Sequence, residues 1–182
     1  LEHFFSIERD QSIFEGLEIS KDTKLCEEYM GKYPVISISL KGINAAAYED
    51  AFDFAVQIMQ RTAEEFQFLS DSEYLSEHDK SVYRELLDSN MSETVFCGGL
   101  KILSKLLEKH YRLKVILLID EYDVPLAKAF ENGYYEQMIF LIRNLLEQAL
   151  KTNNSLKFAV MTGCMRIQMN VMMNILVLRI RK

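Results

Sequence analysis

The stretch KVILLIDEYDVPL, residues 114–126, holds the carboxylates that are best placed to do chemistry. Five apolar residues, 115–119, lead directly into Asp120 and Glu121, and Asp123 follows shortly after. A compact apolar run of this length predicts a buried strand. The acids therefore either mark the point where a strand reaches solvent or are delivered by that strand to a site.

Two other short runs, 35–40 and 158–162, are also apolar or β-branched and predict buried strands. The longer stretches between them repeat apolar residues at three- and four-residue spacing, which predicts amphipathic helices. Strands separated by helices favour an α/β fold with a parallel sheet. The expected helices are 45–69, a shorter helix that starts at Ser76 or Ser81, 92–110 with Ser92 as N-cap, and 134–150.

A pair of glycines, Gly98 and Gly99, lies inside the expected helix 92–110. Each glycine costs about 1 kcal/mol relative to alanine in a helix interior. The pair therefore predicts a kink in this helix or a late start.

Polar side chains follow two of the expected strands at the point where each strand ends. Asp120 and Glu121 end one strand, and Thr162 ends the next. Ligands of parallel sheets bind beyond the carboxyl ends of the strands, where the loops converge. The residue types suggest phosphoryl transfer from a nucleotide: Asp120 would hold Mg²⁺, Glu121 would orient the attacking water, and Thr162 would contact the γ-phosphate.

Two further residues are weaker candidates for this nucleotide site. Asp123 is expected to be a turn or cap residue before Pro125 rather than a ligand. Arg166 is a candidate anion contact, with a plain surface arginine as the alternative.

The bulk composition narrows the class of protein. A length of 182 residues suits one domain. The formal charge of −6 argues against a broadly basic surface that coats nucleic acid, although a local basic patch fits within an acidic average. Three dispersed cysteines and three dispersed histidines indicate reduced thiols, a cytoplasmic location and no zinc site. No apolar run reaches the ~18 to 20 residues of a membrane span.

A glycine-rich phosphate loop of the form GxxxxGK(S/T) is absent from the chain. The only Gly-Lys sequence is Gly31 and Lys32, which is followed by Tyr33 and has Cys26 where the first glycine belongs. Backbone N–H groups and the lysine of such a loop hold the phosphates. The carboxylates at the strand end thus lack one half of a nucleotide site.

Several stretches together resemble a known family. They are IFEGLEIS, YPVISISLKG, VILLIDEYDVPLAKAF, GYYEQM, LIRNLL and FAVMTGCMRI. The chain to about Ile167 resembles the predicted AAA-ATPase-like family of bacterial P-loop proteins, which often carry a C-terminal nuclease-like domain. The combination of IDEYDVPL with TGCMRI is more specific than either motif alone.

The resemblance implies a RecA-like P-loop NTPase fold, with a three-layer parallel sheet in the strand order 5-1-4-3-2. Runs 35–40, 115–119 and 158–162 would then be the second, third and fourth strands. The first strand and the phosphate loop would be missing, so residues 1–167 would be a partial domain. Residues 168–182 would be an atypical tail.

The resemblance also implies the ligand and the roles of the site residues. ATP would bind with Mg²⁺, and Asp120 would be both the metal ligand and, with Arg166, a nucleotide contact. Asp120 and Glu121 would form the Walker B pair, and Glu121 and sensor-like Thr162 would be the catalytic residues of an ATP hydrolase. Without the loop we expect the chain to be inactive alone. Protein or nucleic acid would be partners through a C-terminal domain that the chain lacks, and no membrane contact is expected.

Two other functions fit part of the pattern. A degenerate ATPase could serve as a nucleotide-independent interaction or scaffold module in which the acids are structural. A magnesium nuclease using Asp120 fits less well, because the strand at 158–162 has no Glu-x-Lys.

An uncovered edge on the expected strand 158–162 is an aggregation hazard. The run 175–180 is a candidate to cover that edge.

Overall fold

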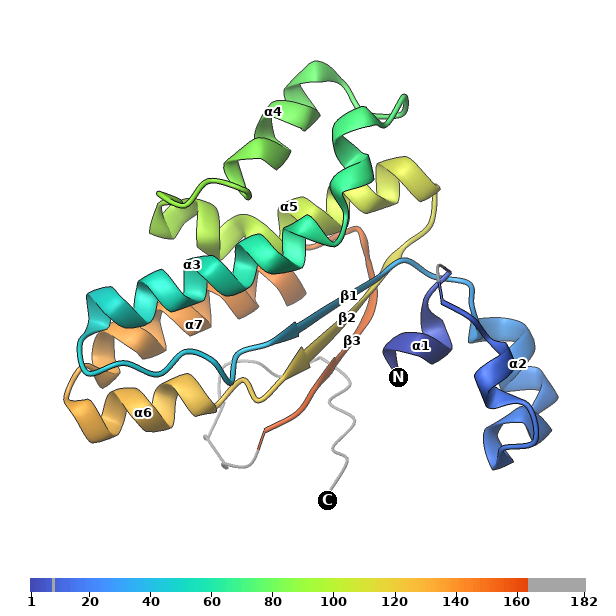
Figure 1. Ribbon diagram of the computed structural model, residues 1–182, viewed down its shortest axis with the longest axis horizontal. Coiled ribbons are helices and arrows are strands. Elements are labelled where there is room, and N and C mark those ends of the chain that lie inside the picture. The colour runs from blue at the N-terminus through green and yellow to red at the C-terminus, as the bar shows by residue number, and fades with distance from the viewer. Residues whose placement is uncertain (8, 164–182) are drawn as a thin grey trace.

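The computed structural model describes residues 1–7 and 9–163. Three parallel strands lie side by side at its centre, in the order β1-β2-β3 (Figure 1). They are β1 (Val35–Ser39), β2 (Val115–Asp120) and β3 (Leu156–Met161). This order matches the 2-3-4 portion of the strand order that the family resemblance implied.

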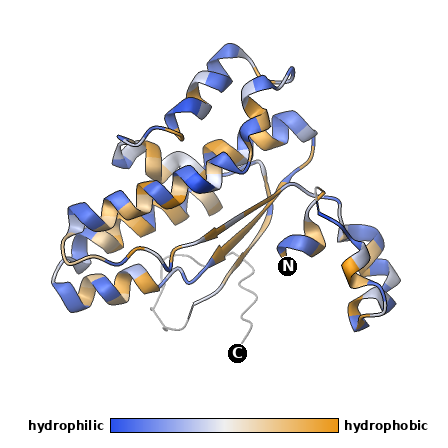
Figure 2. Ribbon diagram, viewed as in Figure 1, coloured by the Kyte–Doolittle hydropathy of each residue, from blue (hydrophilic) through white to orange (hydrophobic). Residues whose placement is uncertain are grey.

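Three long helices cover one face of the sheet (Figure 1): α3 (Tyr48–Glu64), α5 (Glu93–Tyr111) and α7 (Tyr135–Leu150). Figure 2 shows apolar residues over most of the strands and along a stripe of each helix. Alternate strand residues point to this face because side chains alternate along a strand. Those that join the buried core are Ile36, Ile38, Val115, Leu117, Ile119, Ala159 and Met161.

The opposite face of the sheet meets two short helices, α1 (Glu2–Phe5) and α2 (Thr23–Tyr29). The ring of Phe158 on β3 lies edge-on to Phe5 at 5.5 Å and to Tyr29 at 6.1 Å between ring centroids. Helices thus lie on both faces of a parallel sheet. The α/β class and the RecA-like three-layer arrangement predicted from the sequence are confirmed.

The remaining helices extend these layers. Helix α4 (Glu77–Glu85) contacts α5, and α6 (Val124–Asn132) contacts α7. Short 3₁₀ helices cover Ser12–Phe14, Glu18–Lys21 and Gln67–Asp71. The expected helix 45–69 is therefore shorter than predicted, since α3 ends at Glu64 and the 3₁₀ helix follows.

Two of the predicted helix starts are confirmed. Ser92 caps α5, with its side chain accepting a hydrogen bond from the backbone N–H of Val95. Ser76, rather than Ser81, caps α4 through a reciprocal capping box with Asp79. These short side chains satisfy backbone donors that have no partner inside the helix.

The prediction of a late start caused by the glycine pair is wrong. Helix α5 begins at Glu93 and continues through Gly98 and Gly99. A Cβ on Gly99 would lie 2.8 Å from the Sδ of Met59 on α3, closer than real Cβ contacts come. Gly99 therefore permits the close approach of α3 and α5, and the packing of the two helices outweighs the low helix propensity of glycine.

Some predictions fall on residues outside the described ranges. These include Arg166, the atypical tail 168–182 and the proposed edge cover at 175–180. Within the part of the chain that the structure describes, no helix is long and apolar enough to cross a membrane.

Candidate functional site

A row of polar residues lies at the carboxyl end of the sheet. Ser39 pairs with Asp120 across β1 and β2. Thr162 comes directly after Met161, which pairs with Ile119. Because side chains alternate along a strand, Ser39, Asp120 and Thr162 share the face opposite the α3, α5 and α7 layer. The strand-end reasoning from the sequence thus placed Asp120 and Thr162 correctly at one edge.

Hydrogen bonds join the ends of β2 and β3. The Thr162 hydroxyl donates a hydrogen bond to Oδ1 of Asp120 in a short contact. The Thr162 hydroxyl oxygen in turn accepts a long hydrogen bond, 3.4 Å, from the backbone N–H of Glu121. The backbone reinforces this link, since Thr162 N–H donates to the Ile119 carbonyl at 2.9 Å and Tyr122 N–H donates to the Thr162 carbonyl at 3.2 Å. Thr162 therefore holds the Asp120 carboxylate and the start of the following loop in one arrangement.

Glu121 has a backbone conformation that is unusual for its residue type. Its φ is 52°, in the left-handed region that glycine tolerates and other residues adopt at a cost of about 1 kcal/mol or more. The chain leaves β2 through this residue and enters α6 three residues later, after Tyr122 and Asp123. Backbone strain of this kind clusters at functional sites.

Lys41 is a neighbour of Glu121 that the sequence reasoning missed. Its Nζ lies 4.0 Å from Oε2 of Glu121, at the limit of an ion pair, and the lysine side chain is 74% exposed while that of the glutamate is 29% exposed. The Oε2 atom itself is buried and has no hydrogen-bond partner. Lys41 lies just beyond the carboxyl end of β1, and Asp120 and Thr162 lie at the carboxyl ends of β2 and β3. The same strand-end rule, applied to the first run, would have found it.

Asp123 lies at the N-cap position of α6, as expected for a turn or cap residue. Its carbonyl accepts the N–H groups of Leu126 and Ala127, each at 3.1 Å, but its side chain makes no capping bond. Instead, the residue is only 2% exposed. The burial of this aspartate in the loop after β2 was not anticipated, because burial depends on what packs around the loop.

Gly163 allows the loop after β3 to come close to the loop after β2. A Cβ at Gly163 would lie 2.8 Å from Oδ1 of Asp123 and 2.8 Å from Cε1 of Tyr122. Any larger residue would force one of these groups to move. The Thr-Gly sequence after β3 therefore combines a hydroxyl that binds Asp120 with a glycine that makes room for the acidic loop.

The possible metal ligands at this edge of the sheet suit a magnesium ion that keeps most of its water, and they do not suit a metal ion enclosed by protein side chains. Across residues 1–7 and 9–163, no group of three or more His, Cys, Asp or Glu side chains could enclose a metal. Asp120 is exposed at the strand end, however, with Thr162 beside it. Magnesium typically takes one or two carboxylates and completes its shell with water and phosphate oxygens. The residues present fit such an ion and do not fit a closed structural metal site.

Comparison with known proteins decides the family. Residues 1–173 match the family AAA-ATPase-like, described as predicted AAA-ATPase. The chain belongs to the AAA-ATPase-like family. No curated protein and no solved structure matches the sequence. In this AAA-ATPase-like chain, the structure brings together Asp120, Glu121 and Thr162, whereas Arg166 lies outside the described residues.

Proposed function

We propose that Asp120, Glu121 and Thr162 form the metal-binding and water-orienting half of an ATP hydrolysis site. The observation that carries the proposal is the hydrogen bond from Thr162 to Asp120 across the ends of two neighbouring parallel strands. Ligands of open α/β sheets bind at this edge. Membership of the AAA-ATPase-like family supports ATP as the nucleotide.

Asp120 is the proposed contact for Mg²⁺. Its carboxylate is exposed, and its orientation is held by the Thr162 hydroxyl. When bound, the ion would neutralise negative charge on the phosphates. Asp120 would hold the ion at the end of β2, and Thr162 would offer its hydroxyl to the γ-phosphate or to water.

Glu121 is the proposed water-orienting residue. The left-handed backbone turns the chain sharply at this position, and the carboxylate has one buried oxygen without a hydrogen-bond donor. Because the Glu121 side chain is still 29% exposed, the solvent-facing part of its carboxylate can take a hydrogen bond from an attacking water. Lys41, close to the same carboxylate and mostly exposed, is a candidate cation for the phosphates.

These residues supply only part of the chemistry. The 182 residues contain no GxxxxGK(S/T) loop, and the positioning of phosphates provides most of the catalysis in phosphoryl transfer. We therefore propose that the chain by itself does not turn over ATP and that another polypeptide segment supplies the phosphate loop. Micromolar binding of magnesium ATP by this chain in calorimetry would contradict that part of the proposal.

The metal contact can be tested on the chain as it stands. Mn²⁺ prefers the same oxygen ligands as Mg²⁺ and broadens NMR signals of nearby amides even when binding is weak. With Mn²⁺ and ATP we expect broadening of the Glu121 and Thr162 amide signals, and its loss in Asp120→Asn. The matched control is Asp53→Asn on the exposed surface of α3. Equal broadening in the Asp120 variant would refute the assignment.

The role of Glu121 requires turnover to be measured. In a form of the protein that includes a phosphate loop, Glu121→Gln should keep nucleotide binding and lose hydrolysis. Loss of a water-orienting or general-base group typically costs about 10² to 10⁴ in rate. Unchanged turnover would refute the assignment, while loss of binding together with turnover would point to a structural role.

A further inference from the structure

A cavity of about 640 Å³, lined by polar and charged residues, lies at the opposite end of the sheet from Asp120 and Thr162. Its walls are the C-terminal half of α5, which leads into β2, and the loop between α7 and β3. Every lining residue is polar or charged. They are Lys101, Lys105, Glu108, Lys109, Arg112, Thr152, Asn153, Asn154 and Ser155.

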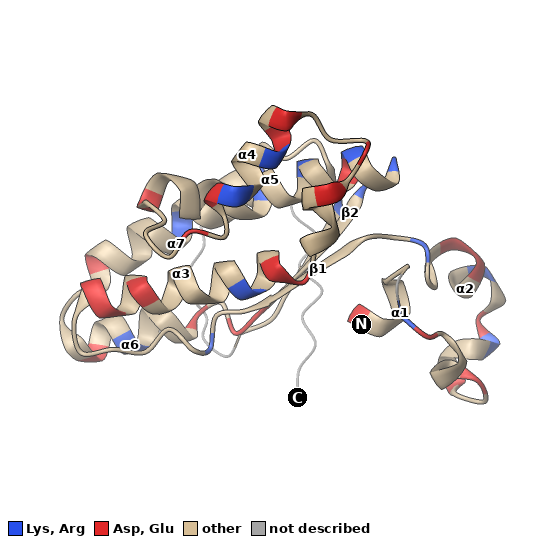
Figure 3. Cartoon of the chain, turned by 45° about the horizontal axis from the view of Figure 1, so that its top comes forward, with Lys and Arg blue, Asp and Glu red and all other residues tan. Residues whose placement is uncertain are grey.

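The cations of the cavity form a row along α5. Lys101, Lys105 and Lys109 recur every four residues, which places them on one face of the helix about 6 Å apart along its axis. Arg112 follows at the end of the helix, so the row extends for about 16 Å. Figure 3 shows basic positions recurring along α5 toward its C-terminal end. The row stands out because the whole chain carries a formal charge of −6.

The one carboxylate that lines the cavity, that of Glu108, is already paired with a lysine. The Glu108 carboxylate lies 2.5 Å from Nζ of Lys114. Partial burial by itself would raise the pKa of Glu108, but hydrogen bonds from Lys114 and Ser155 and the charge of Lys114 outweigh it and lower that pKa. Glu108 is therefore ionised at neutral pH and paired with a lysine outside the cavity, leaving the cavity itself positive.

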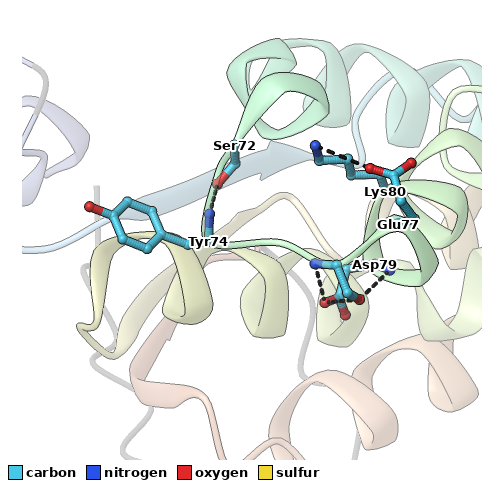
Figure 4. Close-up of polar contacts among 6 residues, drawn as sticks. Ser72, Tyr74, Glu77, Asp79 and Lys80 are labelled. Carbon is cyan, nitrogen blue, oxygen red and sulfur yellow. Dashed lines mark hydrogen bonds and ion pairs between the residues drawn. The ribbon is translucent and has the colours of Figure 1, made fainter.

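One cation of the row has a structural partner on α4. Nζ of Lys109 lies 2.5 Å from Oδ1 of Asp79, and Figure 4 shows Asp79 folded back onto the N-terminal turn of α4. The other three cations make no ion pair with any carboxylate in the described part of the chain. Lys101 donates to the hydroxyl of Thr152 at 3.0 Å, and the Arg112 guanidinium lies 5.7 Å from the centre of the Tyr74 ring. Lys101, Lys105 and Arg112 are thus available to an anion.

The lining favours a chain of phosphates over a small organic ligand. Pockets for small molecules are lined mostly by apolar and aromatic side chains, and none lines this cavity. Lysine, arginine, serine, threonine and asparagine are the side chains that contact the phosphates and sugars of nucleic acids. The absence of an aromatic lining residue also removes the stacking platform that single strands use. A row of cations suits successive phosphates better than one compact anion.

We propose that this basic cavity binds the phosphate backbone of duplex nucleic acid without reading its sequence. The proposal is independent of the ATP site, which lies at the other end of the strands. Three available cations predict a slope of about −3 in the logarithm of the binding constant against the logarithm of salt concentration. Non-specific binding of this kind has dissociation constants of about 10⁻⁴ to 10⁻⁶ M.

Fluorescence anisotropy with a labelled duplex of random sequence tests the proposal between about 50 and 200 mM salt. We expect Lys101→Glu/Lys105→Glu to weaken binding by about tenfold or more and to flatten the salt slope by about 2. The control Lys24→Glu/Lys128→Glu changes the net charge equally at exposed or partly exposed lysines on α2 and α6. If the charge reversals unfold the protein, Lys101→Gln/Lys105→Gln replaces them, with circular dichroism as the check on folding.

Three results would overturn the proposal. One is the absence of duplex binding up to about 10⁻⁴ M protein at the lowest salt. A second is an equal loss of binding in the Lys24 and Lys128 control, which would indicate only overall charge. The third is tight binding of inorganic polyphosphate that depends on Lys101 and Lys105 while neither duplex nor single strand binds, which would identify a free polyanion as the ligand.

Discussion

The adjacent glycines of α5 allow helix propensity to be separated from helix packing. A Cβ at Gly99 would meet Sδ of Met59 at 2.8 Å and its Cε at 2.9 Å. A Cβ at Gly98 would lie 3.5 Å from its nearest neighbours, on Gln148 and Ile102, which is ordinary van der Waals contact. Both glycines are buried in the interior of the same helix, so alanine should improve helix propensity equally at the two positions.

The expected magnitudes follow from these distances. Gly98→Ala should raise the free energy of unfolding by about 1 kcal/mol, the difference in helix propensity. Gly99→Ala gains the same amount but must displace Met59, which is fully buried. Overpacking of this kind costs about 1 to 3 kcal/mol. The variant should therefore range from neutral to about 2 kcal/mol less stable than the parent, and clearly less stable than Gly98→Ala.

Urea unfolding followed by far-UV circular dichroism measures both variants. The decisive comparison repeats Gly99→Ala in a Met59→Val background, where the two atoms closest to the new Cβ are absent. Valine keeps a γ carbon, and Met59 Cγ lies 3.3 Å from the new Cβ, so in that background Gly99→Ala should become stabilising by up to about 1 kcal/mol. If Gly99→Ala is as stable as Gly98→Ala in the parent, or if Met59→Val leaves its effect unchanged, close approach of α3 and α5 does not explain the glycine.

Three further predictions concern the site and the end of α5. Gly163→Ala should destabilise the protein by about 1 to 3 kcal/mol and shift the NMR signals of the loop at Asp123, which its Cβ would overlap; unchanged signals would contradict the close contact. Glu121→Gly should be about 1 kcal/mol more stable than Glu121→Ala, because only glycine accepts a φ of 52° without strain, and urea midpoints compare them. Burial alone would raise the pKa of Asp79, but the hydrogen bonds from Lys109 and from the N-cap residue Ser76 outweigh burial and lower the pKa to about 2. The ionised Asp79 carboxylate should therefore stabilise the fold fully above about pH 4, and this stabilisation should be lost as the pH falls toward 2. It amounts to at most about 2 kcal/mol, because the partner Lys109 is partly exposed to solvent. Asp79→Asn should remove this part of the acid sensitivity, and an unchanged pH profile of stability would count against the ion pair.

The elements of the fold were predictable where the signal is local. Apolar runs of strand length gave the three strands, and the end of β2 at Asp120 followed from its acids. Ser76 and Ser92 were predictable as N-caps because their hydrogen bonds span only three residues. Helix α6 was not predicted, although Pro125 in its first turn and Gly133 after its last residue are ordinary start and stop signals.

The candidate site was predictable in its location but not in its detail. Asp120 and Thr162 could be placed at one edge because parallel strands align their carboxyl ends. The hydrogen bond between them, the burial of Asp123 and the proximity of Lys41 to Glu121 depend on how separate segments pack. No periodicity within a single segment encodes those contacts.

The amino-acid sequence by itself determined the alternation of strands and helices, the acids at the end of β2, and a family-like pattern over most of the chain. The tertiary structure decided which faces meet. It placed Gly99 against Met59, and it joined the lysines of α5 to the loop before β3 in a basic cavity within an acidic chain. Hydrophobic period and capping act over a few residues, whereas close approach and local charge arise from segments that are distant in sequence.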